Sequence, residues 1–356
     1  MRATVNPASK VTPKLDKADV SEIEVGEDDN DDTSSFGSSI NSDITSITSS
    51  VYDYVYENGR RYPSLCSRQG ESMLPNDEAE QERLDLSHHF LLLMMRGNLY
   101  QSPLAETRPK RVLDLGTGTG IWAIHFADNH PYCEVVGIDL SPLQPTWIPP
   151  NLHFEIDDFE GDDWGYPDDK KFDFIHCRSL VGTVKDWPRL VKNIYDNLNP
   201  GGYAEFIETD LVRPYSEDNS LEGTSMKEYH DGLRDAGLKS GIRTDIVPEI
   251  PSYLHAAGFT DIHTQARKAP IGSWPKDRYF KELGVLAGMT AATGYQAYGL
   301  AMFTRVLGWD QEKAQRVIDD VVDCVSNRKR GVHAIYKQYV FYAQKPRAKE
   351  AVEVDT

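Results

Sequence analysis

Short apolar runs alternate with longer amphipathic stretches along the middle of the chain. The short runs predict buried strands, and the longer stretches predict helices that pack against them. We expect helices at 77–99, 121–129 and 187–198, and strands at 111–115, 134–139, 151–156, 172–177 and 203–208. Strands that alternate with helices are joined by right-handed crossovers, so this order predicts a mainly parallel sheet.

The last third of the chain is more helical. Further helices are expected at 225–236, 249–257 and 311–327, and two further strands at 260–267 and 335–344. The segment 277–307 is long and apolar, it is nearly uncharged over 283–303, and it contains several glycines, which weaken a helix. Such a segment is either buried on all sides or covers an apolar ligand. The pattern predicts an α/β fold with a mainly parallel seven-stranded sheet, flanking helices and a helical lid insertion.

Residues 1–50 have a different composition from the rest of the chain. They carry ten acidic and four basic residues, and eleven of the eighteen residues from 33 to 50 are Ser or Thr. Such a segment buries too little apolar surface to offset the entropy lost on ordering, so we predict a disordered acidic tail. It is either a plain solvated tail or a docking element for a protein partner.

Composition excludes several classes of function. The formal net charge of −18 argues against a nucleic-acid surface, because phosphate binding needs basic residues. No apolar run approaches the ~20 residues of a membrane-spanning helix, and no signal pattern opens the chain. The four cysteines are far apart, at Cys66, Cys133, Cys177 and Cys324. Their spacing fits neither a metal site nor a disulfide framework, so no metal is expected and a cytoplasmic location is the simple interpretation.

A glycine-rich loop is expected where the strand at 111–115 meets the next helix. The sequence runs from Asp114 through Gly116, Gly118 and Gly120. A dinucleotide fingerprint would need a further glycine at position 121, where this chain has Ile121. An acid at the strand end also suits a cationic ligand group better than a pyrophosphate. The loop therefore favours S-adenosylmethionine, whose amino group Asp114 can attract, over NAD.

Acidic residues close the next two strands. Asp139, followed by Leu140, is placed to accept hydrogen bonds from ribose hydroxyls. Asp158 is favoured over Asp157 as the acceptor of the adenine amino group, and the backbone of Phe159 can meet the ring. Taken singly, these acids could cap a turn or lie in solvent. Together they lie at the carboxyl ends of successive strands, where open parallel sheets bind ligands.

With these residues in hand, the chain resembles the fungal LaeA-like family of class I methyltransferases. The resemblance covers about residues 52–345 and is carried by YENGR (56–60), LDLGTGTGIWAI (113–124) and GIDLSPLQP (137–145). It implies a Rossmann-like fold, S-adenosylmethionine as cofactor, and a YENGR segment that folds over the methionine end of that cofactor. Tyr56 and Arg60 would then contact it, Arg60 through the carboxylate; alternatively, Arg60 is a surface residue.

The resemblance also divides the chain into parts. After the tail of residues 1–50, the methyltransferase domain covers 51–345, and a second tail covers 346–356. Within the domain, the expected parts are a cofactor-covering segment, a cofactor-binding core, the substrate and lid helices, and a closing strand, at 51–109, 110–210, 211–330 and 331–345.

Candidate catalytic residues lie at the carboxyl ends of the fourth and fifth strands. Methyl transfer from a sulfonium depends mainly on alignment and exclusion of water, and a base helps only when the acceptor still holds its proton. The candidates are His176, Arg178, Ser179 and Glu208. His176 could instead be a hydrogen-bonded core residue, and Glu208 could pair with a neighbouring cation.

The favoured function is methylation of O or N on a small fungal secondary metabolite. The second interpretation is a nuclear regulator of secondary-metabolite genes that binds the cofactor and acts through protein partners. A protein methyltransferase is the third. The regulator predicts stable partner complexes, whereas the small-molecule enzyme predicts a closed apolar pocket beside the cofactor.

Overall fold

The fold is built on one seven-stranded sheet. The computed structural model describes residues 21–26, 54–63, 72–161 and 164–347. The sheet has the strand order β5-β4-β3-β6-β7-β9-β8, in which β3 to β7 are parallel and β9 is antiparallel to both neighbours. Its strands are β3 (Arg111–Leu115), β4 (Glu134–Asp139), β5 (Leu152–Ile156), β6 (Phe172–Arg178), β7 (Leu198–Thr209), β8 (Thr260–Pro270) and β9 (Ile335–Gln344).

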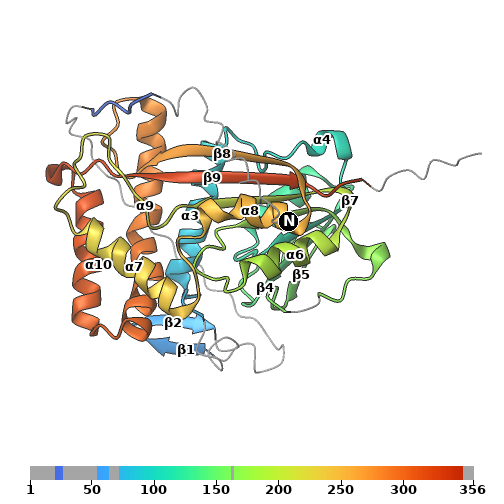
Figure 1. The fold of residues 1–356 in the computed structure, drawn as a ribbon, viewed down its shortest axis with the longest axis horizontal. Coiled ribbons are helices and arrows are strands. Elements are labelled where there is room, and N and C mark those ends of the chain that lie inside the picture. Colours follow the sequence, from blue (N-terminus) through green and yellow to red (C-terminus); the bar gives the residue numbers. More distant parts are fainter. Residues whose placement is uncertain (1–20, 27–53, 64–71, 162–163, 348–356) are drawn as a thin grey trace, which may run out of the picture.

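Helices cover both faces of the sheet (Figure 1). On one face, α5 (Ile121–Asn129) packs Trp122 and Phe126 against β3 and β4, close to α4 (Leu104–Thr107). On the other face, α6 (Trp187–Asn197) and α8 (Ile250–Ala257) bury Trp187 and Leu254. Burial on both faces explains why the parallel strands are apolar runs rather than alternating ones.

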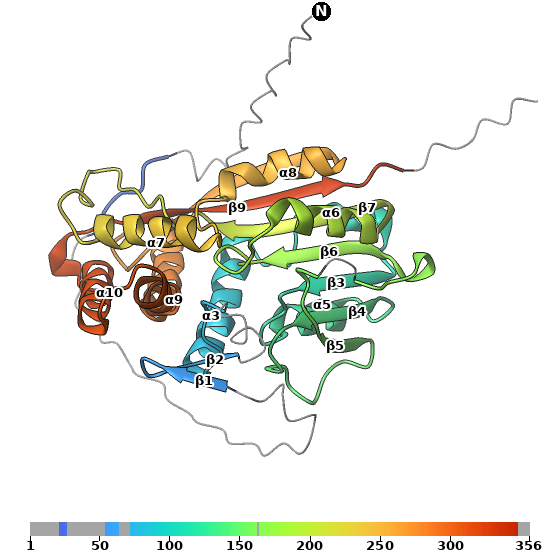
Figure 2. The same ribbon diagram turned by 60° about the horizontal axis from the view of Figure 1, so that its bottom comes forward.

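A separate helical layer lies beyond the carboxyl ends of the parallel strands (Figure 2). It contains α3 (Glu78–Met94), α7 (Met226–Ser240), α9 (Arg278–Ala301) and α10 (Gln311–Ser326), which share one apolar core. The hairpin of β1 (Tyr54–Glu57) and β2 (Arg60–Pro63) lies beside α3. Asp77, Asp277 and Asp310 accept a backbone N–H at the starts of α3, α9 and α10, respectively.

The predicted Rossmann-like fold is confirmed, with two local differences. Strand β7 begins at Leu198, because residues 199–202 pair as an irregular stretch beside β6 instead of forming a separate turn. Helix α9 ends at Ala301 and continues as a π-helical turn, Met302–Val306. Among the described residues, no helix is both long enough and apolar enough to cross a bilayer.

The tail prediction is wrong for residues 21–26. Ile23 is buried, and its N–H donates to Glu217 Oε2 at 2.8 Å. Farther along, the N–H of Gly26 donates to the Trp274 carbonyl at 2.7 Å. A single apolar side chain of this acidic segment therefore packs into the hydrophobic core of the domain. The average composition of the segment does not reveal such a contact. The other residues of 1–50 and the residues from 348 onwards lie outside the described residues. Val51, where the methyltransferase domain is expected to begin, lies outside them too.

Candidate functional site

A pocket lies where the loops after β3, β4, β5 and β6 meet the start of α3. We call it the glycine-loop pocket. Each of these loops follows the carboxyl end of a parallel strand, which is the edge where the sequence predicted a ligand site. Eight predicted residues line it: Gly116, Gly118, Asp139, Leu140, Asp158, Phe159, Arg178 and Ser179.

The glycine loop turns sharply between β3 and α5. Gly116, Gly118 and Gly120 have φ values of 66°, 58° and 79°, in the left-handed region that favours glycine. A Cβ atom on Gly120 would lie 2.4 Å from the ring of Phe154. The loop therefore needs glycine at this position both for its backbone conformation and for its close packing on β5.

Asp114 does not face the pocket, which corrects its predicted contact with a ligand amino group. Its carboxylate is buried, accepts from Thr117 Oγ1 at 2.6 Å, and lies 2.7 Å from His176 Nδ1. Thr117 is in the glycine loop, so Asp114 holds the loop in place. Asp114 pairs with His176 across β3 and β6, and the two side chains meet on the face covered by Trp122 of α5, a detail that the loop sequence alone does not show.

Asp139 closes β4 and lines the pocket. Its two carboxylate oxygens accept the N–H groups of Gly118 at 2.8 Å and Ser141 at 2.9 Å. Removal from water raises its pKa, against the lowering effect of these backbone donors. Asp139 thus ties the glycine loop to the end of β4 and presents a carboxylate to the pocket.

The loop after β5 places its two acids differently. Asp158 lines the pocket, whereas Asp157 does not and instead accepts the N–H of Asp158 at 2.8 Å. The ring of Phe159 is buried at the pocket wall. This placement agrees with the choice of Asp158 over Asp157, and the adenine role of Asp158 and Phe159 stays a prediction.

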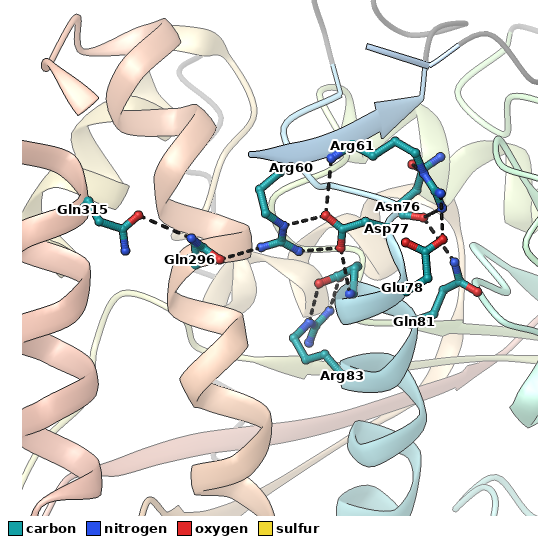
Figure 3. A network of polar contacts seen from close by, with 10 residues as sticks. Arg60, Arg61, Asn76, Asp77, Glu78, Gln81, Arg83, Gln296 and Gln315 are labelled. Carbon is teal, nitrogen blue, oxygen red and sulfur yellow. Dashed lines mark hydrogen bonds and ion pairs between the residues drawn. The ribbon is translucent and has the colours of Figure 1, made fainter. Parts of the chain in front are cut away.

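The YENGR segment lies away from the pocket. The side chain of Tyr56 is 74 % exposed. Arg60 is buried, but its guanidinium forms two hydrogen bonds to Asp77, at 2.6 and 2.9 Å, and one to Gln296 of α9 at 3.1 Å (Figure 3). The predicted cofactor contacts of Tyr56 and Arg60 are therefore corrected: Arg60 fastens the β1–β2 hairpin to α3 and α9.

The first turns of α3 supply pocket residues that the sequence interpretation did not assign. Glu80 and Arg83 are both buried and line the glycine-loop pocket. Arg83 donates twice to Glu80, at 2.8 and 2.6 Å. Burial disfavours its charge, but this ion pair outweighs burial and raises the pKa of Arg83. The spacing of three residues on a helix was the available signal.

Two catalytic candidates are corrected by their contacts. His176 is fully buried and stacks on Trp122 with ring centres 3.7 Å apart. Glu208 is also fully buried and accepts the N–H groups of Leu180 at 2.8 Å and Val181 at 3.2 Å. Burial raises the pKa of Glu208 to about 8. His176 is a core residue, as the alternative held, and Glu208 anchors the loop after β6.

A second, mostly apolar pocket lies between α3, α7, α9 and β9, and we call it the α9 pocket. Six residues from 287 to 298 of α9 line it, including Ala287 and Ala291. It shares Arg83, Ser179 and Tyr298 with the glycine-loop pocket, so the two adjoin. Ser179 lies at this junction with a φ of 57°, in the left-handed region that few side chains other than glycine adopt.

Comparison with known proteins identifies the family. A model described as a methyltransferase domain matches residues 87–264. The chain is 42 % identical to methyltransferase pytC of Aspergillus terreus, over 86 % of this chain and 92 % of that protein. It is 36 % identical to the secondary metabolism regulator LAE1 of Cochliobolus heterostrophus, over 82 % and 94 % of the two chains. It is 34 % identical to the protein-methionine methyltransferase laeA of Emericella nidulans, over 82 % and 76 %. The chain belongs to the fungal LaeA-like family of class I S-adenosylmethionine-dependent methyltransferases.

Proposed function

We propose that this methyltransferase modifies a small apolar molecule in the α9 pocket. The observation that carries the proposal is the junction of the two pockets at Arg83, Ser179 and Tyr298. A cofactor in the glycine-loop pocket and an acceptor in the α9 pocket would meet there, away from bulk water. When bound, S-adenosylmethionine supplies a methyl group on a positively charged sulfur.

The residues of the glycine-loop pocket fit the chemical groups of S-adenosylmethionine. At one end, the ion pair of Glu80 and Arg83 offers a carboxylate and a guanidinium to a ligand end that carries an ammonium and a carboxylate. At the other end, Asp139 offers a carboxylate to the ribose hydroxyls, and Asp158 and Phe159 offer an acceptor and an apolar wall to adenine. Arg83 thus takes the carboxylate role predicted for Arg60.

Calorimetric titration with S-adenosylmethionine tests this assignment. We expect Asp139→Ala to bind more weakly than the unchanged protein by about 1.5–3 kcal/mol, because charge-assisted hydrogen bonds are lost. The matched control is Asp157→Ala, which removes a neighbouring carboxylate that does not line the pocket. Equal losses in the two variants, or tighter binding of NAD than of S-adenosylmethionine, would overturn the assignment.

A protein acceptor is the second candidate, and the name of the Emericella nidulans relative favours it. The two candidates differ in where the methyl group goes. With tritium-labelled S-adenosylmethionine and an extract, a small-molecule enzyme labels the fraction that remains soluble in acid. A protein methyltransferase labels the acid-precipitated fraction instead. Our proposal expects the first result, and label confined to protein would contradict it.

A further inference from the structure

Three polar side chains form a hydrogen-bonded chain in the wall of the α9 pocket. His230 comes from α7, Tyr336 from β9 and Tyr295 from α9. His230 Nε2 lies 2.5 Å from the Tyr336 hydroxyl, which lies 2.9 Å from the Tyr295 hydroxyl. All three are buried, and all three line the pocket. They are far apart in the sequence, so no local motif predicts that they meet.

The direction of the hydrogen bonds in this chain follows from its last partner. His230 Nδ1 lies 2.5 Å from the carbonyl oxygen of Met226, which can only accept, so Nδ1 carries the imidazole proton. Nε2 is then an acceptor, and the Tyr336 hydroxyl donates to it. Because Tyr336 has one proton to give, its oxygen accepts from Tyr295. The Tyr295 oxygen keeps its own accepting capacity.

The rest of the pocket wall is mostly apolar. Of the described residues that line it, only Arg83 carries a permanent charge. Apolar groups come from Phe90, Leu211, Leu233 and Ile271, among others. A mostly apolar site with a directed polar chain favours a largely apolar ligand that carries a group able to donate to that chain.

We propose that the chain Tyr295–Tyr336–His230 takes the proton of a substrate hydroxyl, so that the acceptor is an apolar phenol or enol and the product is a methyl ether. This rests on the function proposed above. The substrate proton moves to the Tyr295 oxygen, the Tyr295 proton to Tyr336, and the Tyr336 proton to His230 Nε2. The substrate oxygen forms the new bond to the methyl carbon with a lone pair, and sulfur keeps the electron pair of the broken S–C bond.

The charge balance of this step is favourable. The positive charge of the sulfonium disappears as the imidazolium of His230 forms, and the imidazolium then loses its proton to solvent as the product leaves. A neutral amine needs no such proton acceptor before it attacks, because it already has a free lone pair. The directed chain therefore favours oxygen over nitrogen as the acceptor atom.

Burial keeps His230 neutral before the reaction, with Nε2 as a hydrogen-bond acceptor, and it disfavours the imidazolium, so the proton that His230 takes up is held only briefly. Burial lowers its pKa to about 4, against smaller raising effects from the Met226 carbonyl and Asp231 of the same helix. The groups that face the chain from other elements are themselves neutral at physiological pH. They are Tyr295 of α9 and Tyr336 of β9, and Tyr229 beside His230 on α7 is neutral as well, because burial raises the pKa of all three hydroxyls.

The test compares two phenols that differ in whether a proton must be removed. Near pH 8, 2-naphthol still holds its hydroxyl proton, whereas 4-nitrophenol is ionised. We expect Tyr295→Phe, Tyr336→Phe and His230→Gln to lower kcat at least ~100-fold with 2-naphthol, the low end of general-base effects. With 4-nitrophenol the same variants should stay close to the unchanged protein, because the proton is already gone. Tyr253→Phe, which removes a hydroxyl that donates to Glu249 outside the pocket, is the control.

A second readout does not depend on turnover. Nitrogen-15 NMR of labelled histidine should show His230 with its proton on Nδ1, and the resonance of its Nε2 should shift in Tyr336→Phe, which removes the hydrogen bond. Equal loss of activity with both phenols, no loss in any variant, or methylation of 2-naphthylamine in preference to 2-naphthol would overturn the inference. Binding of S-adenosylmethionine without methylation of either phenol would also overturn it and leave the proposed function standing. Absence of cofactor binding would overturn the proposed function itself.

Discussion

Two carboxylates at the carboxyl ends of central strands hold loops that border the pockets. Asp139, which is partly buried, and Glu208, which is fully buried, each accept two backbone N–H groups from these loops. A carboxylate has enough lone pairs to accept several N–H groups at once, whereas an amide side chain would turn its own donor towards one of them. Both acids therefore set the geometry of the site, and Asp139 also lines the glycine-loop pocket.

Glu208 gives the fold a predictable dependence on pH. Burial raises its pKa from an ordinary 4.5 to about 8, and the N–H donors of Leu180 and Val181 oppose this only in part. The folded protein thus holds a proton that the unfolded chain releases between these values. The contribution of Glu208 to the free energy of unfolding is therefore full below about pH 4.5. It falls by up to ~1.4 kcal/mol per pH unit as the pH rises to about 8.

Urea unfolding at several pH values measures this effect. Glu208→Gln cannot ionise, so its free energy of unfolding should fall less steeply with pH than that of the unchanged protein. Glu282→Gln, at an exposed position of α9, should keep the original slope. A Glu208→Gln variant with the same slope as the unchanged protein would show that Glu208 does not carry the extra proton.

Gly120 supports a prediction with a matched glycine. In Gly120→Ala, the new methyl group meets the ring of Phe154 at 2.4 Å, and the backbone is also in the left-handed region. We expect a loss of ~1–3 kcal/mol from overpacking and a further ~1–2 kcal/mol from the backbone. Gly165→Ala has a φ of 69° and open space around it, so only the backbone cost applies. Thermal melting measures both variants, and equal losses in Gly120→Ala and Gly165→Ala would contradict the prediction.

At the scale of single residues, the sequence predicted positions better than contacts. Asp139 and Asp158 lie at the pocket because the carboxyl ends of parallel strands share one edge, which strand order along the chain already implies. Arg60 was assigned to the cofactor, but its partner Asp77 is set by how the hairpin packs on α3. His176 was misassigned because both faces of the sheet are covered, so alternation along β6 does not separate core from pocket.

At the scale of elements, α9 supports the lid interpretation of the apolar segment 277–307. Ala287 and Ala291 line the α9 pocket, whereas Val285 on the same helix is exposed. We expect Ala291→Phe to raise the KM for the acceptor and to change acceptor choice, while affinity for S-adenosylmethionine stays the same. Ala287 is almost fully buried, so Ala287→Phe should add ~1–3 kcal/mol of overpacking strain.

Steady-state kinetics and thermal melting together distinguish the outcomes for α9. Val285→Phe is the control, and it should change neither the KM nor the melting temperature appreciably, because its new ring points to solvent. If Ala291→Phe lowers stability and leaves acceptor kinetics unchanged, the segment is core and the acceptor site must be sought elsewhere along the junction with the glycine-loop pocket.

Element boundaries could be predicted where local pattern decides them. The bounds of β3, α5, β4 and β9 equal the predicted ranges because each is a clear apolar or amphipathic run between turn signals. The start of β7 at Leu198 was missed because it depends on pairing with β6 across an irregular stretch. The π-helical turn after α9 was missed because no turn signal separates residues 302–306 from α9, so the sequence predicts a continuation of the same helix.

At the scale of the whole molecule, alternation of strands and helices predicted the fold but not the strand order. The last strand in sequence, β9, lies between β7 and β8 and runs antiparallel to both. No local pattern specifies that insertion, because it depends on pairing between strands that are far apart in the sequence. The layer itself brings α3 and α9 together with α7, and so creates the pocket where His230, Tyr295 and Tyr336 meet.

Residues 21–26 contact the domain, and we expect this contact to stabilise the full chain. Ile23 is 6 % exposed, whereas Val25, two residues on, is 47 % exposed. The backbone of the segment also bonds to Glu217 and Trp274 and accepts the N–H of Lys276 through Glu24 at 2.6 Å. A buried aliphatic side chain and several directed bonds are what a short segment needs to remain bound.

We expect Ile23→Ala to lower the free energy of unfolding by about 2 kcal/mol, the low end for loss of a buried aliphatic side chain. The loss cannot exceed the free energy with which the segment binds, because beyond that point the segment simply detaches. Val25→Ala should stay within about 0.5 kcal/mol of the unchanged protein. Removal of residues 1–20 should leave the melting temperature unchanged, and removal of 1–26 should lower it. Identical melting of the two truncated proteins would mean that the segment adds nothing to stability, and a domain that begins at residue 51 would then be as stable as the full chain.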